Sequence, residues 1–288
     1  MRSTRRALLL VLALSPVVAH AGPFTREQGG FYLGLSYARL STDKLYAPDF
    51  KRVSIAPYQQ HLVGLYAEIG VASWLTATLD ANLLRENQLD RQGATLGLGD
   101  WRLGILVPLL KQPAHLTFAA TLGIPLGDAS PSAGAHATPD AQAVARSLPT
   151  GDGEWDLDLR VTFGHTFGGA RRWPLRHYLV LEAGYWTRTR FQSSFVWRFE
   201  LGTKLPWHVV DRFWLAVRLG GVESFASNKQ AALTATGLGD GVTYVSPGVL
   251  LYARVWRGLG ASVAWDTVVR GRSIATGSQL TVGVSYTR

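Results

Sequence analysis

Histidines are the residues of this sequence best suited to metal binding or proton transfer, because the chain contains no cysteine. Beyond the first 21 residues they stand at His61, His115, His136, His165, His177 and His208. No two of them have the spacing of zinc ligands, so we expect no metal site and no bound cofactor. His165 and His177 are candidates for the base of a lipid-modifying hydrolase. Neither has an evident serine and orienting partner, so we expect that the protein is not an enzyme.

Two glycine-rich stretches are candidates for phosphate binding. The tetrapeptide GLGD occurs at 97–100 and again at 237–240. Neither stretch completes the G-x-G-x-x-G pattern, since Arg102 and Val242 stand where the third glycine is needed, and no strand-to-helix transition is expected there. Close packing of small residues in strands is the favoured interpretation.

Charged residues alternate with apolar ones in many segments. In the 156–161 stretch, Asp156, Asp158 and Arg160 alternate with leucine and valine. Successive side chains of a strand point to opposite faces, so one face is apolar and the other charged. A charge on a lipid-facing position of a membrane barrel costs about 2 to 4 kcal/mol near the midplane, so we expect the charged face to line the lumen. The predicted lumen-lining residues are Glu68, Asp80, Asp100, Arg102, Asp156, Asp158, Arg160, Glu182, Arg198, Glu200, Lys204, Arg218 and Asp266.

The N-terminus has the pattern of a secretory signal peptide. Three arginines precede the apolar run ALLLVLAL, and small residues at Ala19 and Ala21 mark a cleavage site before Gly22. We therefore predict a signal peptide over 1–21 and one domain over 22–288. No later stretch has 18 consecutive apolar residues, so any membrane crossing must be made by strands.

Segments of about ten residues with alternating polarity recur along the mature chain, which is typical of an outer-membrane barrel. The predicted strands, about twelve, lie near 30–41, 60–70, 73–84, 94–109, 115–125, 154–167, 177–188, 195–205, 212–222, 243–254, 258–268 and 279–287. Links after the even strands are short and links after the odd strands mostly long, as for periplasmic turns and extracellular loops. The fold class is therefore all-β: a transmembrane antiparallel β-barrel in the bacterial outer membrane.

Aromatic and basic residues suggest contact with lipid. Tryptophans at or beside the proposed periplasmic turns suit a membrane interface: Trp74, Trp173, Trp207 and Trp256. The formal charge of +9 is spread over many strand ends, which favours anionic head groups over nucleic acid. Expected partners are outer-membrane lipids, a small solute, and the barrel-assembly machinery during biogenesis. The terminus departs from the aromatic ending of many barrels, since Thr287 and Arg288 follow Tyr286.

Several segments, in order and spacing, resemble the outer-membrane protein family linked to meta-pathway phenol degradation. They are FYLGLSYARLSTD, HLVGLYAEIGVASWLTATL, GLGDWRLGI, LPTGDGEWDLDLRVTFGHTF, YLVLEAGYWTR and VSPGVLLYARVWRGLGASVAWDTVVRGR. The resemblance covers nearly the whole mature chain. It implies transport of aromatic or other hydrophobic compounds, and it carries no established binding residue onto this sequence.

Three functions remain open at this stage. A barrel of about twelve strands is wider than one filled by side chains and narrower than an open porin, which favours a channel for small compounds. A structural or surface-interaction barrel with a closed lumen, or a lipid-modifying hydrolase, are the alternatives. The segments 42–59, 126–153 and 223–242 are long enough to fold over the mouth of the barrel.

Overall fold

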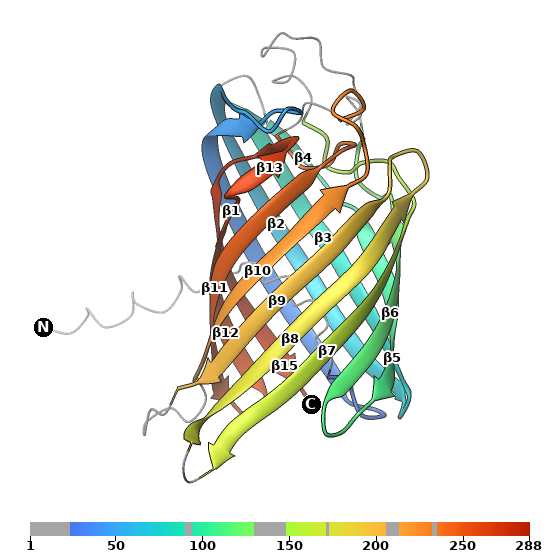
Figure 1. Ribbon diagram of the computed structural model, residues 1–288, viewed down its shortest axis with the longest axis vertical. Coiled ribbons are helices and arrows are strands. Elements are labelled where there is room, and N and C mark those ends of the chain that lie inside the picture. Colours follow the sequence, from blue (N-terminus) through green and yellow to red (C-terminus); the bar gives the residue numbers. More distant parts are fainter. Residues whose placement is uncertain (1–23, 90–93, 130–147, 171–172, 206–212, 232–234) are drawn as a thin grey trace, which may run out of the picture.

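Twelve long strands form a closed antiparallel barrel in the computed structural model, which describes residues 24–89, 94–129, 148–170, 173–205, 213–231 and 235–288 (Figure 1). They are β1 (Phe31–Tyr46), β2 (Arg52–Ala72), β3 (Leu75–Leu89), β5 (Trp101–Leu110), β6 (His115–Ile124), β7 (Asp156–Ala170), β8 (Trp173–Arg188), β9 (Ser194–Lys204), β10 (Phe213–Ser224), β11 (Thr243–Trp256), β12 (Leu259–Thr267) and β15 (Ser278–Thr287). Each strand pairs with the next in this order, and β15 pairs with β1 to close the ring. The predicted signal peptide lies outside the described residues. Among those described, no helix has the length and apolarity to cross a membrane.

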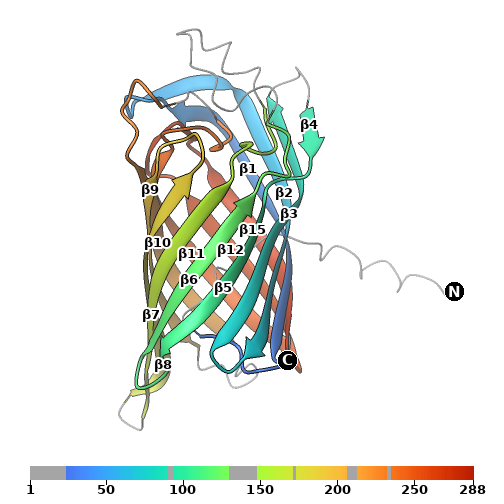
Figure 2. The ribbon, with the colours of Figure 1, turned by 90° about the vertical axis from the view of Figure 1, so that its right-hand side faces the viewer.

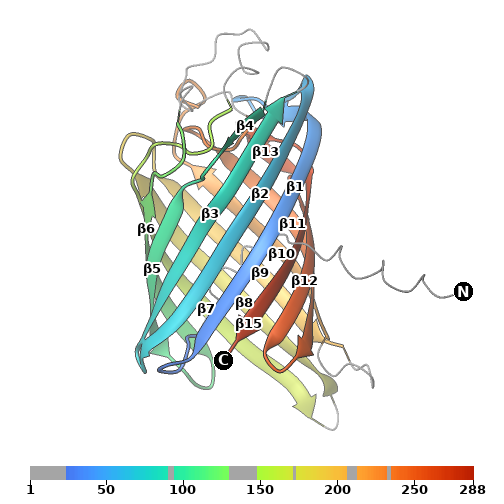
Figure 3. The same ribbon diagram turned by 180° about the vertical axis from the view of Figure 1, so that it is seen from behind.

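Both chain termini of the barrel lie at one end, where β1 and β15 meet. The amide of Phe31 donates to the carbonyl of Arg288 (3.0 Å), and the reverse hydrogen bond is also formed. This end carries the short turns, so it is the periplasmic end of such a barrel, here called the inner end. The strands slope steeply across the wall, and the other end, called the outer end, carries the longer links (Figure 3).

The outward and inward faces of the strands differ in exposure as a membrane barrel requires. On the outward face, Leu103 and Leu157 are 48% and 40% exposed, whereas Asp158 on the inward face is 2% exposed. A soluble sandwich has the reverse arrangement. Trp74 and Trp256 are exposed at inner-end turns, while Trp207 and the side chain of Trp173 lie outside the description. The all-β barrel predicted from alternation is confirmed, and its architecture is that of an outer-membrane β-barrel.

The prediction of a long loop at 42–59 is wrong. β1 and β2 continue as a paired hairpin to Tyr46 and Arg52, so only 47–51 is a turn. Figure 2 shows this hairpin at the outer end, above the slanted wall. The extension is stable because Leu45 and Tyr58 point inward and are fully buried against segments from elsewhere in the chain.

The predicted strand 94–109 is two strands. The short β4 (Ala94–Gly97) pairs with the outer part of β3, and β5 begins only at Trp101. Between them, the amide of Gly99 donates to the Asn82 carbonyl (2.9 Å), and the Asn82 side chain donates to the Asp100 carbonyl (3.1 Å). Asp100 therefore belongs to a link rather than to a strand. Two further short strands, β13 (Arg270–Arg272) and β14 (Ile274–Ala275), lie between β12 and β15.

Candidate functional site

A layer of ion pairs lines the barrel interior, with Arg160 of β7 at its centre. The Arg160 Nε donates to Oδ1 of Asp158 (2.8 Å), and Nη1 donates to Oε1 of Glu182 on β8 (2.7 Å). Both carboxylates are buried, and Thr162 adds a hydrogen bond to the second oxygen of Glu182 (3.2 Å). A guanidinium shared by two carboxylates has its orientation determined by the wall itself, so this layer is rigid.

Arg102 of β5 reaches across β6 to the same acids. Its Nη2 lies 3.7 Å from Oδ2 of Asp156, and its Nη1 lies 3.8 Å from Oδ2 of Asp158. The intervening residue of β6 is Gly123, and a Cβ there would overlap the Asp156 carboxylate. Glycine at this point leaves room for the Asp156 carboxylate over the strand, whereas a larger residue would displace it.

A similar arrangement, an arginine that reaches over a glycine to an aspartate two strands away, occurs between β10 and β12. Arg218 of β10 reaches over Gly248 of β11 to Asp266 of β12, with Nε 2.9 Å from Oδ1. A Cβ at Gly248 would overlap the Asp266 carboxylate. Arg198 of β9 is less well paired, because its Nη2 lies 3.6 Å from Oε2 of Glu182 and its buried Nε has no hydrogen-bond partner among the described residues.

The remaining predicted lumen residues are less central. Asp80 lies opposite Arg102 in the β3–β5 register, and Glu200 accepts a hydrogen bond from the Tyr178 hydroxyl (2.6 Å). Lys204 is placed at the inner end of β9. Sequence reasoning missed the aromatic partners, of which Tyr178 is one, because an inward tyrosine has no distinguishing signal in an alternating pattern.

Asp100 has a different environment from the one expected. The sequence predicts it on a lumen-facing strand, but its carboxylate accepts hydrogen bonds from the amides of Gly127 (3.0 Å) and Asp152 (2.9 Å). It thereby ties the start and the end of the link between β6 and β7 to the break after β4. The stretches 97–100 and 149–153 meet here, where Gly97 packs against Thr150.

Two cavities lie inside the barrel on either side of the central layer. The larger measures about 440 Å³ and the smaller about 60 Å³. Arg102, Arg160 and Glu182 line both. The ion-pair layer therefore separates two spaces of the same lumen and forms a constriction between them.

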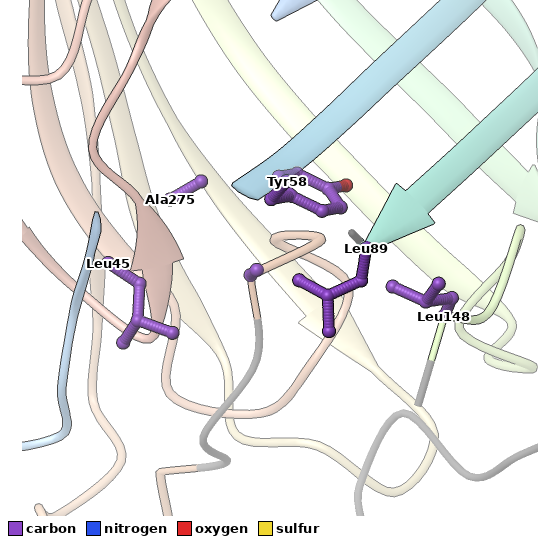
Figure 4. Close-up of a cluster of buried hydrophobic side chains, with 6 residues drawn as sticks. Leu45, Tyr58, Leu89, Leu148 and Ala275 are labelled. Atoms are coloured by element: carbon purple, nitrogen blue, oxygen red, sulfur yellow. The ribbon is translucent and has the colours of Figure 1, made fainter. Parts of the chain in front are cut away.

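An apolar cluster lies at the outer end and contributes to the lining of the larger cavity (Figure 4). Its members come from three strands, two links and a short strand: Leu45, Tyr58, Leu89, Leu148, Ala235 and Ala275. We call it the mouth cluster. The links 126–153 and 223–242, which are long enough to fold over the mouth, contribute Leu148 and Ala235 to this cluster. Residues 130–147 and 232–234 of these links lie outside the described residues.

Polar side chains of the wall hold these two links through their backbone. Asn87 donates to the Pro149 carbonyl (2.7 Å), and Arg85 donates to the Thr236 carbonyl (2.7 Å). Beside the mouth cluster, burial raises the pKa of Asp152 to about 6. This carboxyl therefore gains a proton at mildly acidic pH, close to where the link enters the mouth.

The inner end is crossed by the residues before β1. The Arg26 guanidinium pairs with Glu68, which also accepts a hydrogen bond from the Tyr66 hydroxyl (2.8 Å). The Arg26 amide donates to Oγ1 of Thr76 (3.0 Å), and the ring of Phe24 lies 4.7 Å from that of His115. The sequence carries no periodic signal for this short segment, so reasoning from alternation missed it.

The histidines are dispersed. His177 shares a hydrogen bond with Thr203 (2.8 Å) on the outward face. The ring of His165 is stacked on that of Phe167, with 6.2 Å between the ring centroids. His136 and His208 lie outside the described residues. Within the part of the chain that the structure describes, no three residues among His, Asp and Glu gather in a way that could hold a metal ion.

Comparisons with known proteins support the fold. No family model matches the sequence, and no curated protein matches it. Among solved structures, the chain is similar to an outer membrane channel from Pseudomonas putida F1, with 15% identity and a TM-score of 0.65 over 94% of this chain and 100% of that one. It is also similar to the beta domain of the Bordetella autotransporter BrkA, with 12% identity and a TM-score of 0.52 over 91% and 100% of the two chains.

Proposed function

We propose that this protein is an outer-membrane channel that passes small compounds through a narrow, charge-lined lumen. The observation that carries the proposal is the pair of cavities that share Arg102, Arg160 and Glu182 as a common wall. A structural barrel has no need for internal space on both sides of a constriction. The similar protein from Pseudomonas putida is an outer membrane channel, which supports the same function for this chain.

The constriction would select solutes by size and polarity. Its ion pairs span neighbouring strands, so the opening there cannot widen without breaking charge-assisted hydrogen bonds. The links at the outer end would open and close access to it, since apolar contacts between links are easier to separate. Aromatic and other hydrophobic compounds are candidate solutes because of the sequence resemblance to the phenol-degradation family, and outer-membrane lipids would surround the barrel.

A closed structural barrel is the second candidate. The mouth cluster lies at the outer end and the Arg26 segment at the inner end, and under this alternative the two block the lumen. Under this alternative, the internal charges only neutralise one another and no solute passes.

Permeability of liposomes that contain the purified protein separates these two functions. Small ions, sugars and simple aromatic acids would be tested, with protein-free liposomes as background. We expect solute-selective uptake that Thr121→Trp reduces to background, because Thr121 lines the smaller cavity. Ala120→Trp is the matched control, since it places the same ring one residue along β6 on the outward face. Background permeability of the wild-type protein for every solute would support the closed barrel instead.

A further inference from the structure

The larger cavity has two chemically different walls. Toward the outer end, its lining is mostly apolar and includes the underside of the mouth cluster, with Gln60 and Thr236 as polar neighbours. The apolar residues are Leu40, Tyr58, Val222, Ala235, Ile274 and Ala275. On the opposite side, it is lined by guanidinium groups from four strands of the wall: Arg102, Arg160, Arg198 and Arg218. A molecule held there would meet an apolar surface at one end and cations at the other.

The hydrogen-bonding capacity of these arginines is used unequally. Arg160 and Arg218 donate to carboxylates through two or more nitrogens. Arg198 has one ion-pair contact of 3.6 Å and a buried Nε without a partner among the described residues. Arg102 has ion-pair contacts of 3.7 and 3.8 Å, and its guanidinium lies 5.0 Å from the centroid of the Trp186 ring. Each guanidinium has five N–H donors, and a buried donor without an acceptor is costly. These two side chains therefore present donors that a ligand can satisfy.

The balance of basic and acidic residues differs between the two cavities. The charged residues that line the larger cavity, among those described, are the four arginines with Glu182 and Asp266. The smaller cavity is lined by Arg102 and Arg160 with three acids, which are Asp80, Asp158 and Glu182. Basic groups thus predominate at the wall of the larger cavity, whereas acidic groups predominate below the constriction.

We propose that the larger cavity is a binding site for a small organic anion with an apolar body, such as a short-chain carboxylate. The carboxylate would accept hydrogen bonds from Arg102 and Arg198, and the apolar body would lie against Tyr58 and its neighbours. A volume of about 440 Å³ is within the usual range for small-molecule sites. This inference deepens the proposed channel function by naming a solute class, but binding itself does not require transport.

Isothermal titration calorimetry tests the site with the purified protein in phosphatidylcholine nanodiscs. Hexanoate is the probe, and three relatives each lack one feature: acetate lacks the apolar body, 1-hexanol lacks the charge, and hexylammonium reverses it. Empty nanodiscs measure partition into lipid. We expect saturable binding of hexanoate, at least tenfold tighter than that of any of the other three. Equal binding of hexanoate and 1-hexanol would overturn the proposal.

Two arginine variants locate the site. Arg198→Gln should weaken hexanoate binding at least tenfold, while its melting temperature stays close to that of the wild type because Arg198 has one distant ion pair. Arg254→Gln is the matched control, since Arg254 is an exposed arginine near the inner end of β11, away from the cavity. Equal affinity in both variants would place the ligand elsewhere.

Repeating the titration with Leu148→Asp, which disrupts the mouth cluster, tests whether that cluster limits access of hexanoate to the cavity. Absence of hexanoate binding in both the wild type and this variant refutes the site. Binding without any solute permeability leaves the site intact and refutes the channel function, whereas permeability without binding does the opposite.

Discussion

The mouth cluster and the central ion-pair layer both border the larger cavity, but different forces hold them together. The mouth cluster consists of apolar side chains, several of them on links, that contact one another without directional bonds. The central layer consists of Arg160, Asp158 and Glu182 on the paired strands β7 and β8, joined by charge-assisted hydrogen bonds. Apolar contacts depend on area and tolerate displacement, whereas ion pairs between strands depend on geometry.

This difference indicates which part of the barrel can move. Strands of a closed barrel hold their neighbours on both sides, so the layer that they carry cannot shift as a unit. The links at the mouth are held by a few side-chain hydrogen bonds, such as those of Asn87 and Arg85, and can separate at smaller cost. We therefore assign opening and closing to the mouth and selection to the layer.

Removal of the Arg160 guanidinium should cause the largest change, a loss in the free energy of unfolding. Arg160→Ala leaves Asp158 and Glu182 as buried carboxylates without their main partner, and breaking such a pair costs about 3 to 5 kcal/mol. Urea unfolding in lipid vesicles, followed by tryptophan fluorescence, would measure the loss. The triple variant Asp158→Asn, Arg160→Met, Glu182→Gln removes all three charges and should recover part of the loss, because Arg198 then lacks its Glu182 partner. A loss below about 1 kcal/mol for Arg160→Ala would contradict the rigid layer.

A charge placed in the mouth cluster should open the outer end without unfolding the barrel. Leu148→Asp buries a carboxylate in an apolar cluster, which costs several kcal/mol unless the link moves out. We expect single-channel conductance to rise severalfold while the unfolding midpoint in urea changes little, because Leu148 lies outside the strands. Leu96→Asp is the control, since Leu96 is 62% exposed on β4. Unchanged conductance in Leu148→Asp would show that the mouth cluster is not the gate.

The smallest expected effect is a change in the open fraction of the channel with pH. Burial raises the pKa of Asp152 from 3.8 to about 6, with a further increase from Asp100 that Arg188 opposes. An acid whose pKa is raised in the closed form stabilises that form at low pH, and this stabilisation is lost as the pH rises from about 4 to about 6. The open fraction in planar bilayers should therefore increase at least threefold over this range and level off above it. Asp152→Asn should abolish that step, and a step that persists in this variant would assign it to another group.

Alternation of polarity predicted much of the molecule correctly. All twelve long strands overlap predicted segments, and the outward positions of β5 and β7 are apolar and exposed as expected. The errors occur where contacts with distant segments, rather than alternation, decide the structure. The 42–59 segment continues its strands because its inward residues meet distant links, and Asp100 leaves the strand because Asn82 holds the chain break.

The candidate site was predicted only as a set of inward charges. Parity placed Arg102, Asp156 and Arg160 on one face, but it could not pair Arg102 with a carboxylate two strands away. That pairing depends on Gly123 in the intervening strand, whose role is visible only in the assembled wall. The Arg26 segment was missed altogether, since a few residues before a strand form no pattern.

The sequence by itself determined the fold class, the order of the strands along the chain and the alternation of charged and apolar faces within the strands. These properties follow from local periodicity, because lipid outside the barrel and polar groups inside impose a repeat of two on every strand. Only the tertiary structure decided which arginines are saturated, where the cavities lie and what closes the mouth. Those properties depend on contacts between residues far apart in the chain, such as Tyr58 with Leu148 and Ala235 in the mouth cluster, and no local pattern encodes such distances.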